Sequence, residues 1–510
     1  MVEGKSEKKK EDASAGKRKR SEMLVVMKFG GAAMADGAKI RRVASLVRRF
    51  RSDFDVVVVT SALSGVTDAL LENAQRIATE CRKERVCEFL NEIRKRHFSA
   101  AEEAILSAEG GGEKVKAAEA EAAEGARTNA EESILSEVKR EIEERLAELE
   151  NALLGICLLG ELTNRSLDFI LSFGERLSAP ILAGTLRSLG LNAVHLTGGE
   201  AGIITDENFG KAQPLENAEE EVRERIEPLL ARGVTPVICG FIGQSERGFV
   251  TTLGRGGSDY TATIVGAALN ADEIWLWKDT EGIMSADPKI VKNAQKIPYL
   301  SYVEAMELSY FGATVLHPRA MEPVMRKKIP IRVKNLLNPD DDGTLIGEET
   351  AKTDKIAKAV TLIENASILN VAGSGIASIS EVASEIFAAL ARAGIEVVMI
   401  SQGSSERTIS LVIKRSQLRD ALEAMRSLQK KGLIREFSSD SEVCAVGVVG
   451  AGMVGTPGVA GKIFSALGNA GISVRMISQG SSEFNISFVV NKSDAYKAVQ
   501  AVHDTFGMGK

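Results

Sequence analysis

Apolar runs and helical stretches alternate along the first part of the chain. The run "LVVMKFGG" ends in Gly-Gly, and Ile40, Val43, Leu46 and Val47 follow it at the spacing of one helix face. A second run, "DVVVVTSA", leads through a turn into a stretch rich in Leu and Ala. This order of strand, helix and strand predicts a parallel sheet covered by helices.

The alternation stops between residues 76 and 160 and then resumes. Glu and Lys or Arg recur four residues apart in "SEVKREIEERLAELE", and "EGGGEK" interrupts the pattern at 109–114. We therefore expect amphipathic helices on the surface, forming an insertion without a site of its own. The later runs "NAVHLTGG", "VTPVICGFIG", "EIWLWKDTEG" and "PIRVKN" complete a predicted core domain at 23–346.

The C-terminal region contains an internal repeat. Residues 371–412 align without a gap on residues 448–489, and both copies contain "MISQGSSE". Each copy reads as strand, loop, helix, strand, hairpin, strand and helix, which predicts two small α/β modules related by a pseudo-twofold axis. We place the modules at 360–437 and 442–507.

A glycine motif in the second copy resembles a dinucleotide-binding fingerprint. In "GAGMVG", Gly450, Gly452 and Gly455 match GxGxxG, but Arg475 and apolar residues stand where an acidic residue is expected. The first copy has "GSGIAS" at the equivalent place. We therefore interpret these glycines as shaping a strand-to-helix loop, one able to close on a small effector.

Composition excludes several classes of protein. A net charge of −6 with 26% charged residues argues against a dedicated nucleic-acid binder. No apolar run reaches the length of a membrane span, and the N-terminus lacks the apolar core of a secretory signal, so we expect a cytoplasmic protein. Residues 1–22 are expected to form a disordered basic tail.

The five cysteines, at positions 81, 87, 157, 239 and 444, are scattered. They show no CxxC spacing with histidine partners. We therefore expect neither a disulfide framework nor a zinc site, and we expect the thiols to be reduced.

Polar residues that suit phosphate chemistry follow several of the predicted strands. Lys28 precedes a Gly-Gly pair, "SALSGVT" presents Ser61 and Thr67, and Glu175 opens a helix after "SFG". The stretch "TTLGRGGSDYTA" sets three glycines before a helix start, which predicts an anion cradle or, equally, a tight strand-to-helix turn. Phosphoryl transfer requires such cations and N–H groups, and no Walker A motif is present.

Together these motifs resemble the aspartokinases of the amino-acid kinase superfamily. The resemblance covers residues 24 to about 506 and rests on "KFGG", "VVVVTSALSGVTDALL", "FGERLSAP", "GFIGQSERGFVTTLGRGGSDYTA", "DPKIV", "SYFGATVLHP" and the paired modules. It implies a three-layer α/β/α core with a mainly parallel sheet, followed by two ferredoxin-like ACT modules. It also implies transfer of phosphate from ATP, with Mg2+, to L-aspartate, giving 4-phospho-L-aspartate for lysine, threonine and methionine biosynthesis.

The resemblance also implies site residues. Lys28 and Asp259 are expected to act at the transferred phosphate, and aspartate is expected to bind Ser61, Thr67, Glu175, Arg255 and Ser258. ATP contacts are expected at Gly30, Gly31, Gly256, Gly257, Asp279, Gly282, Asp287, Lys289 and Thr314. An amino-acid effector, lysine or threonine, is expected at Ser374, Gly375, Ser378, Ser401, Gln402 and Ser404, in a homodimer or larger assembly with no metal site built from protein side chains alone.

Three departures from the family pattern concern the phosphate site. Ala32 and Ala33 replace two hydroxyl residues, Thr314 stands where the family has lysine, and Lys278 stands where it has threonine. We hypothesise that Lys278 supplies, from a neighbouring loop, the catalytic charge that Thr314 no longer provides. The alternative is that Lys278 is a solvated loop residue and the nucleotide site has decayed.

Two other functions compete with an active aspartokinase. A catalytically impaired paralogue could sense amino acids as a regulatory subunit of an active kinase, and the three departures favour it. Another amino-acid kinase, acting on glutamate or an acetylated analogue, is disfavoured by the tandem modules. We expect no fused homoserine dehydrogenase, because no dinucleotide domain follows residue 510.

Overall fold

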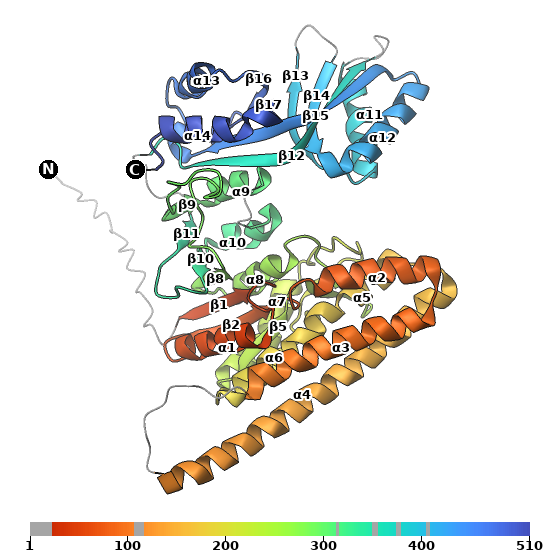
Figure 1. The fold of residues 1–510 in the computed structure, drawn as a ribbon, viewed down its shortest axis with the longest axis vertical. Coiled ribbons are helices and arrows are strands. Elements are labelled where there is room, and N and C mark those ends of the chain that lie inside the picture. The colour runs from red at the N-terminus through yellow and green to blue at the C-terminus, as the bar shows by residue number, and fades with distance from the viewer. Residues whose placement is uncertain are drawn as a thin grey trace, which may run out of the picture.

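The computed structural model describes residues 23–106, 117–312, 316–348, 355–373, 379–403 and 408–509. The predicted basic tail at 1–22 and the "EGGGEK" segment fall outside them. A core domain and a C-terminal antiparallel sheet lie one above the other, and β9 (Tyr299–Ser301) and α9 (Tyr302–Tyr310) lie between this sheet and the rest of the core (Figure 1). None of the helices in the described part of the chain combines the length and apolar character that a membrane crossing requires.

An eight-stranded sheet forms the centre of the core domain. Its strand order is β3-β5-β2-β1-β8-β10-β11-β9, and all neighbours are parallel except β10 and β11. The mainly parallel sheet is as predicted. The strands are β1 (Leu24–Phe29), β2 (Asp55–Thr60), β3 (Ala193–Leu196), β5 (Thr235–Cys239), β8 (Glu273–Lys278), β9 (Tyr299–Ser301), β10 (Ile331–Asn335) and β11 (Thr344–Gly347).

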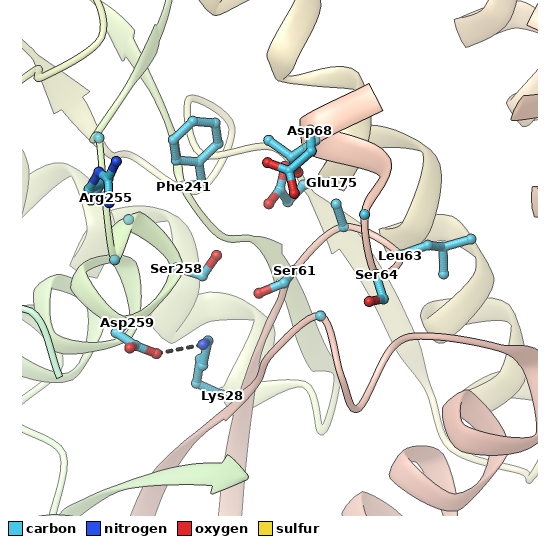
Figure 2. A pocket seen from close by; sticks show the side chains of 17 residues that line it. Lys28, Ser61, Leu63, Ser64, Asp68, Glu175, Phe241, Arg255, Ser258 and Asp259 are labelled. Atoms are coloured by element: carbon cyan, nitrogen blue, oxygen red, sulfur yellow. Dashed lines mark ion pairs between the residues drawn. The ribbon is translucent and has the colours of Figure 1, made fainter. Parts of the chain in front are cut away.

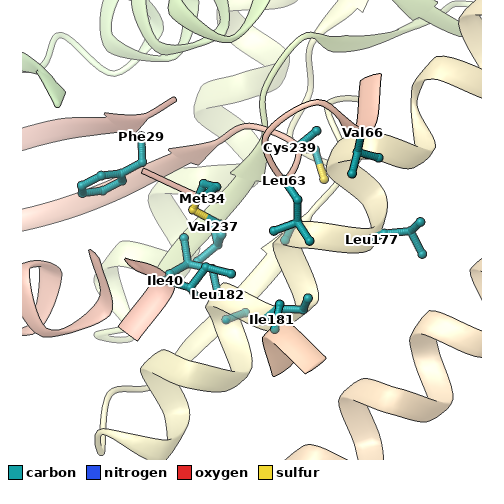
Figure 3. Packing of buried hydrophobic residues seen from close by; sticks show 14 of the residues in the cluster. Phe29, Met34, Ile40, Leu63, Val66, Leu177, Ile181, Leu182, Val237 and Cys239 are labelled. Carbon is teal, nitrogen blue, oxygen red and sulfur yellow. The ribbon is translucent and has the colours of Figure 1, made fainter. Parts of the chain in front are cut away.

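Helices cover both faces of this sheet, because successive side chains of a strand point to opposite sides. In β1, Val25, Met27 and Phe29 pack on the first face and Val26 on the second. The first face is covered by α1 (Gly37–Arg51), α2 (Val66–Glu80) and α6 (Phe173–Ser188), and Figure 3 shows Ile40, Val66 and Leu177 from these helices in one cluster with Phe29. The second face is covered by α7 (Ala218–Ala231), α8 (Gly257–Ala268), α9 (Tyr302–Tyr310), η2 (Pro318–Met321) and α10 (Glu322–Lys327).

Two short elements complete the core domain beside this sheet. A three-stranded sheet has the order β4-β6-β7, and α5 (Asn164–Leu171) packs against β7. The strands are β4 (Ile204–Thr205), β6 (Ile242–Ser245) and β7 (Val250–Thr252).

The predicted insertion is a pair of long helices, α3 (Lys83–Leu106) and α4 (Ala117–Leu159). They run side by side along the outside of the first helical layer (Figure 1). Each buries one face: Phe89 and Ile93 of α3 and Ile142 of α4 are almost completely inaccessible to solvent. The insertion is therefore part of the hydrophobic core as well as of the surface.

The expectation that all cysteines are reduced is wrong for two of them. Cys81, directly after α2, forms a disulfide with Cys157 near the end of α4, and their Cα atoms are 4.6 Å apart. The two residues are 76 positions apart in the sequence, and the packing of α4 against α2 brings them together. Cys87, Cys239 and Cys444 are free thiols.

Reduction of this disulfide should destabilise the helical layer. Crosslinking a loop of this length constrains the unfolded chain by about 4 kcal/mol in the chain-entropy model. We therefore expect Cys157→Ser to lower the guanidinium midpoint under oxidising conditions, and dithiothreitol to lower the wild-type midpoint equally. Cys87→Ser is the matched control and should leave the midpoint unchanged; equal midpoints for wild type and Cys157→Ser without reductant would contradict the prediction.

The C-terminal region is a six-stranded antiparallel sheet of order β13-β14-β12-β15-β17-β16. The repeat appears in its register: Ala366 pairs with Lys414, and Val443 pairs with Asn491, 77 positions later in both strands. The strands are β12 (Ala359–Gly373), β13 (Val397–Gln402), β14 (Thr408–Lys414), β15 (Ile434–Val449), β16 (Val474–Gln479) and β17 (Asn485–Asn491). The helices are α11 (Ile379–Arg392), η3 (Arg415–Gln417), α12 (Leu418–Lys430), η4 (Ala451–Met453), α13 (Val459–Asn469), η5 (Lys492–Asp494) and α14 (Ala495–Thr505).

The two long central strands are shared between the repeats. The first half of β12 pairs with the second half of β15, and the second half of β12 pairs with the first half of β15. The second copy therefore takes its fourth strand from residues 359–363, which precede the first copy in the sequence. The linear module boundaries remain predictions.

The "GAGMVG" segment forms the loop and the η4 turn between β15 and α13. Gly450 and Gly452 lie so close to the backbone of residues 355–358 that a Cβ on either would approach it to about 2.6 Å. The N–H of Ala451 donates to the carboxylate of Glu304 on α9, at 2.7 Å. The loop thus packs against the core domain. Glycine is required here because the backbone of residues 355–358 approaches so closely.

Candidate active site

A cavity of about 350 Å³ lies beside the C-terminal ends of β1 and β2. The loops after these strands, the first turn of α6 and the glycine segment before α8 enclose it (Figure 2). Its lining includes Lys28, Gly31, Ser61, Thr67, Glu175, Arg255, Gly256, Gly257, Ser258 and Asp259. The structure therefore brings together all the predicted aspartate-binding residues with two of the three predicted catalytic ones.

Two helices begin at this cavity, and each begins at a glycine. Gly65 precedes α2 with φ 78°, and Gly256 precedes α8 with φ 68°; neither helix has a side-chain cap among the described residues. A Cβ on Gly256 would lie 2.6 Å from the Cβ of His317, so a larger residue does not fit. Uncapped N–H groups and the positive ends of two helix dipoles thus face one cavity, which favours anionic groups such as phosphates.

A buried ion pair stands at the base of the cavity. Lys28 is the second-last residue of strand β1, and its Nζ lies 2.5 Å from the Oδ1 of Asp259 on α8 (Figure 2). Burial raises the pKa of the Asp259 carboxyl, but the charges of Lys28 and Lys278 outweigh burial and hold this pKa below its usual value. Asp259 is thus an ionised carboxylate that fixes the lysine ammonium in place.

Lys278 is the last residue of β8, which pairs directly with β1. The expectation that it lies in a loop is wrong. Burial lowers the pKa of its ammonium, the charge of Asp259 raises it, and that of Lys28 lowers it further. Lys278 therefore belongs to the same charged cluster behind the cavity lining, while Thr314 lies outside the described residues.

Glu175 presents a buried carboxylate to the cavity. Its side chain comes from the first turn of α6, the residue is 3% exposed, and Oε2 has no hydrogen-bond partner among the described residues. Burial raises the pKa of Glu175 to about 8, although backbone N–H groups and Lys28 oppose the shift. A buried carboxylate without a partner is costly unless a cationic ligand pairs with it.

The sequence analysis missed seven residues that line the cavity: Ala62, Leu63, Ser64, Gly65, Asp68, Phe241 and Gly254. Asp68 stands in the first turn of α2, and its side chain lines the same cavity as Glu175 (Figure 2). Its signal was present, because Asp68 follows Thr67 directly in "SGVTD". Phe241 gave no such signal; it comes from the segment between β5 and β6.

Five predicted ATP contacts in the described part of the chain do not line the cavity. Asp279 and Gly282 follow β8, at the same sheet edge as Lys278. Asp287 accepts the N–H of Lys289 in a turn, and the neighbouring Ala286 packs against the C-terminal sheet. Gly30 lies beside Lys28, and a Cβ there would be 3.4 Å from its Nζ.

The predicted effector residues are described only in part. Ser374, Gly375, Ser378 and Ser404 lie outside the described residues. Ser401 and Gln402 end strand β13, where Ser401 pairs with Ser410 of β14.

Comparison with known proteins agrees with this geometry. Residues 23–335 match the amino acid kinase family, and residues 369–428 and 446–506 each match an ACT domain. Aspartokinase 1, chloroplastic, of Arabidopsis thaliana is 32% identical over 94% of this chain and 80% of its own length. The chain belongs to the aspartokinases of the amino acid kinase family. It is an aspartate kinase, which transfers phosphate from ATP to the β-carboxylate of L-aspartate.

Solved aspartokinases share its fold. Aspartokinase III of E. coli in complex with aspartate and ADP superimposes with a TM-score of 0.76, at 28% identity, over 94% of this chain and 99% of that one. The same enzyme in complex with lysine and aspartate gives a TM-score of 0.74, at 27% identity, over 95% and 99% of the two chains. The chain also matches plant bifunctional aspartokinase/homoserine dehydrogenases, and it spans about half of their length.

Proposed function

We propose that Lys28 and the two helix N-termini bind the transferred phosphoryl group of ATP. Three sources of positive potential support this role: the Lys28 ammonium and the glycine-capped starts of α2 and α8. Phosphoryl transfer depends on positioning and on charge stabilisation, and both are available where these groups converge. Asp259 holds Lys28 and takes no proton, because the β-carboxylate of aspartate is already ionised at neutral pH.

The same cavity suits the amino-acid substrate. Glu175 pairs with the α-ammonium, Asp68 adds a second carboxylate to the same cavity lining, and Arg255 binds the α-carboxylate as a bidentate donor. Ser61, Thr67 and Ser258 add hydroxyl contacts. The observation that supports this proposal most strongly is the unpartnered Oε2 of Glu175, which a substrate ammonium would satisfy.

Lys278 supplies a second cation to the ATP side. Its half-buried place at the end of β8, within the electrostatic reach of Lys28 and Asp259, argues against a solvated loop residue and thus against a decayed site. Asp279, Gly282, Asp287 and Lys289 continue from the same sheet edge and remain proposed ATP contacts.

Mg2+ is expected to bind mainly through the phosphates of ATP. The described residues contain no group of three or more His, Cys, Asp or Glu side chains placed to hold a metal. This fits Mg2+, which commonly takes few protein carboxylates and completes its shell with phosphates and water. When bound, the ion neutralises charge on the β- and γ-phosphates.

Regulation is proposed to act through the C-terminal modules at 360–437 and 442–507. The two ACT matches and the lysine bound to E. coli aspartokinase III favour an amino-acid effector, with lysine the first choice. Pairing of these modules between chains would give a dimer, and a cytoplasmic location remains part of the same proposal.

One assay tests these assignments. Purified protein should release ADP only with ATP, aspartate and Mg2+ all present, and lysine, threonine or methionine added in turn should identify the inhibitor. EDTA should abolish turnover and excess Mg2+ should restore it. ADP release that does not depend on aspartate, or none at all, would favour the regulatory-subunit alternative.

The raised pKa of Glu175 predicts a pH-dependent affinity for aspartate. Only the ionised carboxylate pairs with the substrate ammonium, so the KM for aspartate should rise about tenfold per pH unit as pH falls below about 8. Glu175→Gln should show a high KM that no longer varies with pH in this range. Because the folded state holds this proton more tightly than the unfolded chain does, wild-type stability should fall as pH rises from about 4.5 to about 8, and the variant should lose that slope.

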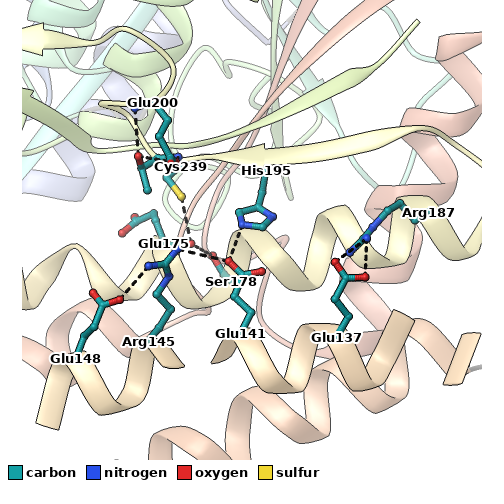
Figure 4. Close-up of polar contacts among 11 residues, drawn as sticks. Glu137, Glu141, Arg145, Glu148, Glu175, Ser178, Arg187, His195, Glu200 and Cys239 are labelled. Atoms are coloured by element: carbon teal, nitrogen blue, oxygen red, sulfur yellow. Dashed lines mark hydrogen bonds and ion pairs between the residues drawn. The ribbon is translucent and has the colours of Figure 1, made fainter. Parts of the chain in front are cut away.

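Glu137→Gln is a suitable control for this experiment. Glu137 forms an ion pair, at 3.0 Å, with Arg187 in the last turn of α6, at the opposite end of this helix from Glu175, and it does not line the cavity (Figure 4). It should keep the wild-type pH profile. A Glu175→Gln enzyme with that same profile would show that another group binds the ammonium.

A further inference from the structure

Asp168 is a buried carboxylate in the core domain that the proposed chemistry does not use. It lies on α5, it is 1% exposed, and it does not line the cavity. Its Oδ2 accepts the N–H groups of Gly210 at 2.9 Å and Thr252 at 2.8 Å, and its Oδ1 accepts the Thr252 hydroxyl at 2.7 Å. Three donors therefore converge on one buried side chain, which fixes their relative positions.

The residues that Asp168 holds lead directly to the cavity. Thr252 ends β7, and Arg255 follows three residues later. Gly210 supports the same segment from the other side, because its carbonyl oxygen lies 3.0 Å from the position of a Cβ on Gly254. The path of the chain into Arg255 is thus set in part by Asp168 and Gly210, together with the N–H of Leu253, which donates to the Phe241 carbonyl at 2.9 Å.

Asp168 also lies close to Glu175 in the sequence. The helix that carries it, α5, ends at Leu171, Ser172 is the one residue between it and α6, and Glu175 follows Asp168 by seven residues. Glu175 is in turn held to the loop after β2, since the Ser178 hydroxyl, one turn along α6, donates to the carbonyls of Ser61 at 2.8 Å and Glu175 at 3.2 Å. Cys239 also donates to the Glu175 carbonyl, as Figure 4 shows.

We propose that Asp168 is a positioning residue that sets the distance between Arg255 and Glu175, and thereby the KM for aspartate, through Thr252. This inference rests on the proposed function, in which Arg255 and Glu175 bind the two ends of the substrate amino-acid group. Such recognition is sensitive to small displacements, because both ion pairs must form at once on one small molecule. ATP is bound by other groups and should be affected much less.

The chemistry of Asp168 suggests which variants to compare. Asp168→Ala leaves three buried donors without an acceptor. Asp168→Asn can keep all three contacts: its carbonyl oxygen replaces Oδ2, and its amide donates to the Thr252 hydroxyl, which accepts as well as donates. Thr252→Val removes only the contact to Oδ1, and it keeps the volume of the side chain.

Kinetics of the full-length enzyme should separate positioning from a merely structural role. We expect Asp168→Ala to raise the KM for aspartate about tenfold with little change in the KM for ATP, Thr252→Val to raise it less, and Asp168→Asn to stay near wild type. Thr251→Val is the matched control: it is equally buried on the same strand, and its hydroxyl bonds to Thr205 instead, at 2.7 Å. If Asp168→Ala does not fold, Thr252→Val carries the test. A fall in kcat with an unchanged KM for aspartate would overturn the inference.

The same substitutions in an Arg255→Ala background decide how Asp168 acts. If it acts through Arg255, Asp168→Ala and Thr252→Val should add almost nothing to the raised KM of Arg255→Ala. Full additivity would overturn the inference while leaving the proposed function intact. An Arg255→Ala enzyme with a wild-type KM for aspartate would instead overturn the proposed role of Arg255.

Discussion

Lys28→Met should lower kcat about a thousandfold. Among the described residues, Lys28 and Arg255 are the two cations that line the cavity, and Arg255 is assigned to the substrate carboxylate. The KM for ATP should rise less than kcat falls, since the lysine acts on charge that develops during transfer. Steady-state ADP release and single-turnover measurements would give the two values. Lys39→Met, an exposed lysine paired with Asp36, is the control and should keep full activity.

Loss of the Lys28 charge also removes the ion-pair partner of the buried Asp259 carboxylate and leaves it with the weaker attraction of Lys278, which should destabilise the protein. Removing one partner of such a pair typically costs 3–5 kcal/mol, whereas neutralising both is often tolerated. The double variant Lys28→Met with Asp259→Asn should therefore regain wild-type stability and remain inactive. Recovery of activity together with stability would show that Lys28 serves only the fold.

Lys278→Ala should lower kcat about a hundredfold, because a preorganised donor to the phosphates is lost. Adding Thr314→Lys should recover part of the activity by placing a lysine where the family pattern has one. Lys292, an exposed lysine further along the chain, is the control, and its replacement by alanine should have no effect. Activity, ATP affinity and thermal stability should be measured for all four proteins.

Full activity of Lys278→Ala would reject the exchange of the two positions. Equal losses in Lys278→Ala and in the double variant would mean that Lys278 matters but that position 314 does not replace it. In the first case the single cation of Lys28, with the helix N-termini, would carry the phosphate chemistry.

Local pattern predicted much of the site as well as the fold. Lys28, Ser61 and Glu175 each follow an apolar run or open a helix, and the parallel sheet then brings the ends of those runs to one edge. Asp68 could have been found in the same way, from its place beside Thr67. Phe241 could not have been found in this way, because an apolar residue between two strands is predicted to belong to the hydrophobic core.

For the C-terminal repeat too, the sequence predicted the elements but not how all of them are shared between the modules. The offset of 77 residues predicted equivalent strands, and the register pairs of β14 and β17 follow it. It gave no indication that residues 359–363 would complete the second copy. The second copy is completed because the two long strands β12 and β15 each extend through both modules. This depends on how the two strands pair and not on their composition.

The sequence by itself determined the alternation of strands and helices, the paired modules and the residue types at the cavity, since these depend on periodicity and on short motifs. Only the tertiary structure decided that Cys81 meets Cys157, that the half-buried Lys278 lies on the strand next to that of Lys28, and that Asp168 holds the chain before Arg255. Each of these joins segments distant in sequence. Such contacts arise from the packing of the layers, so the local sequence around each residue does not predict them.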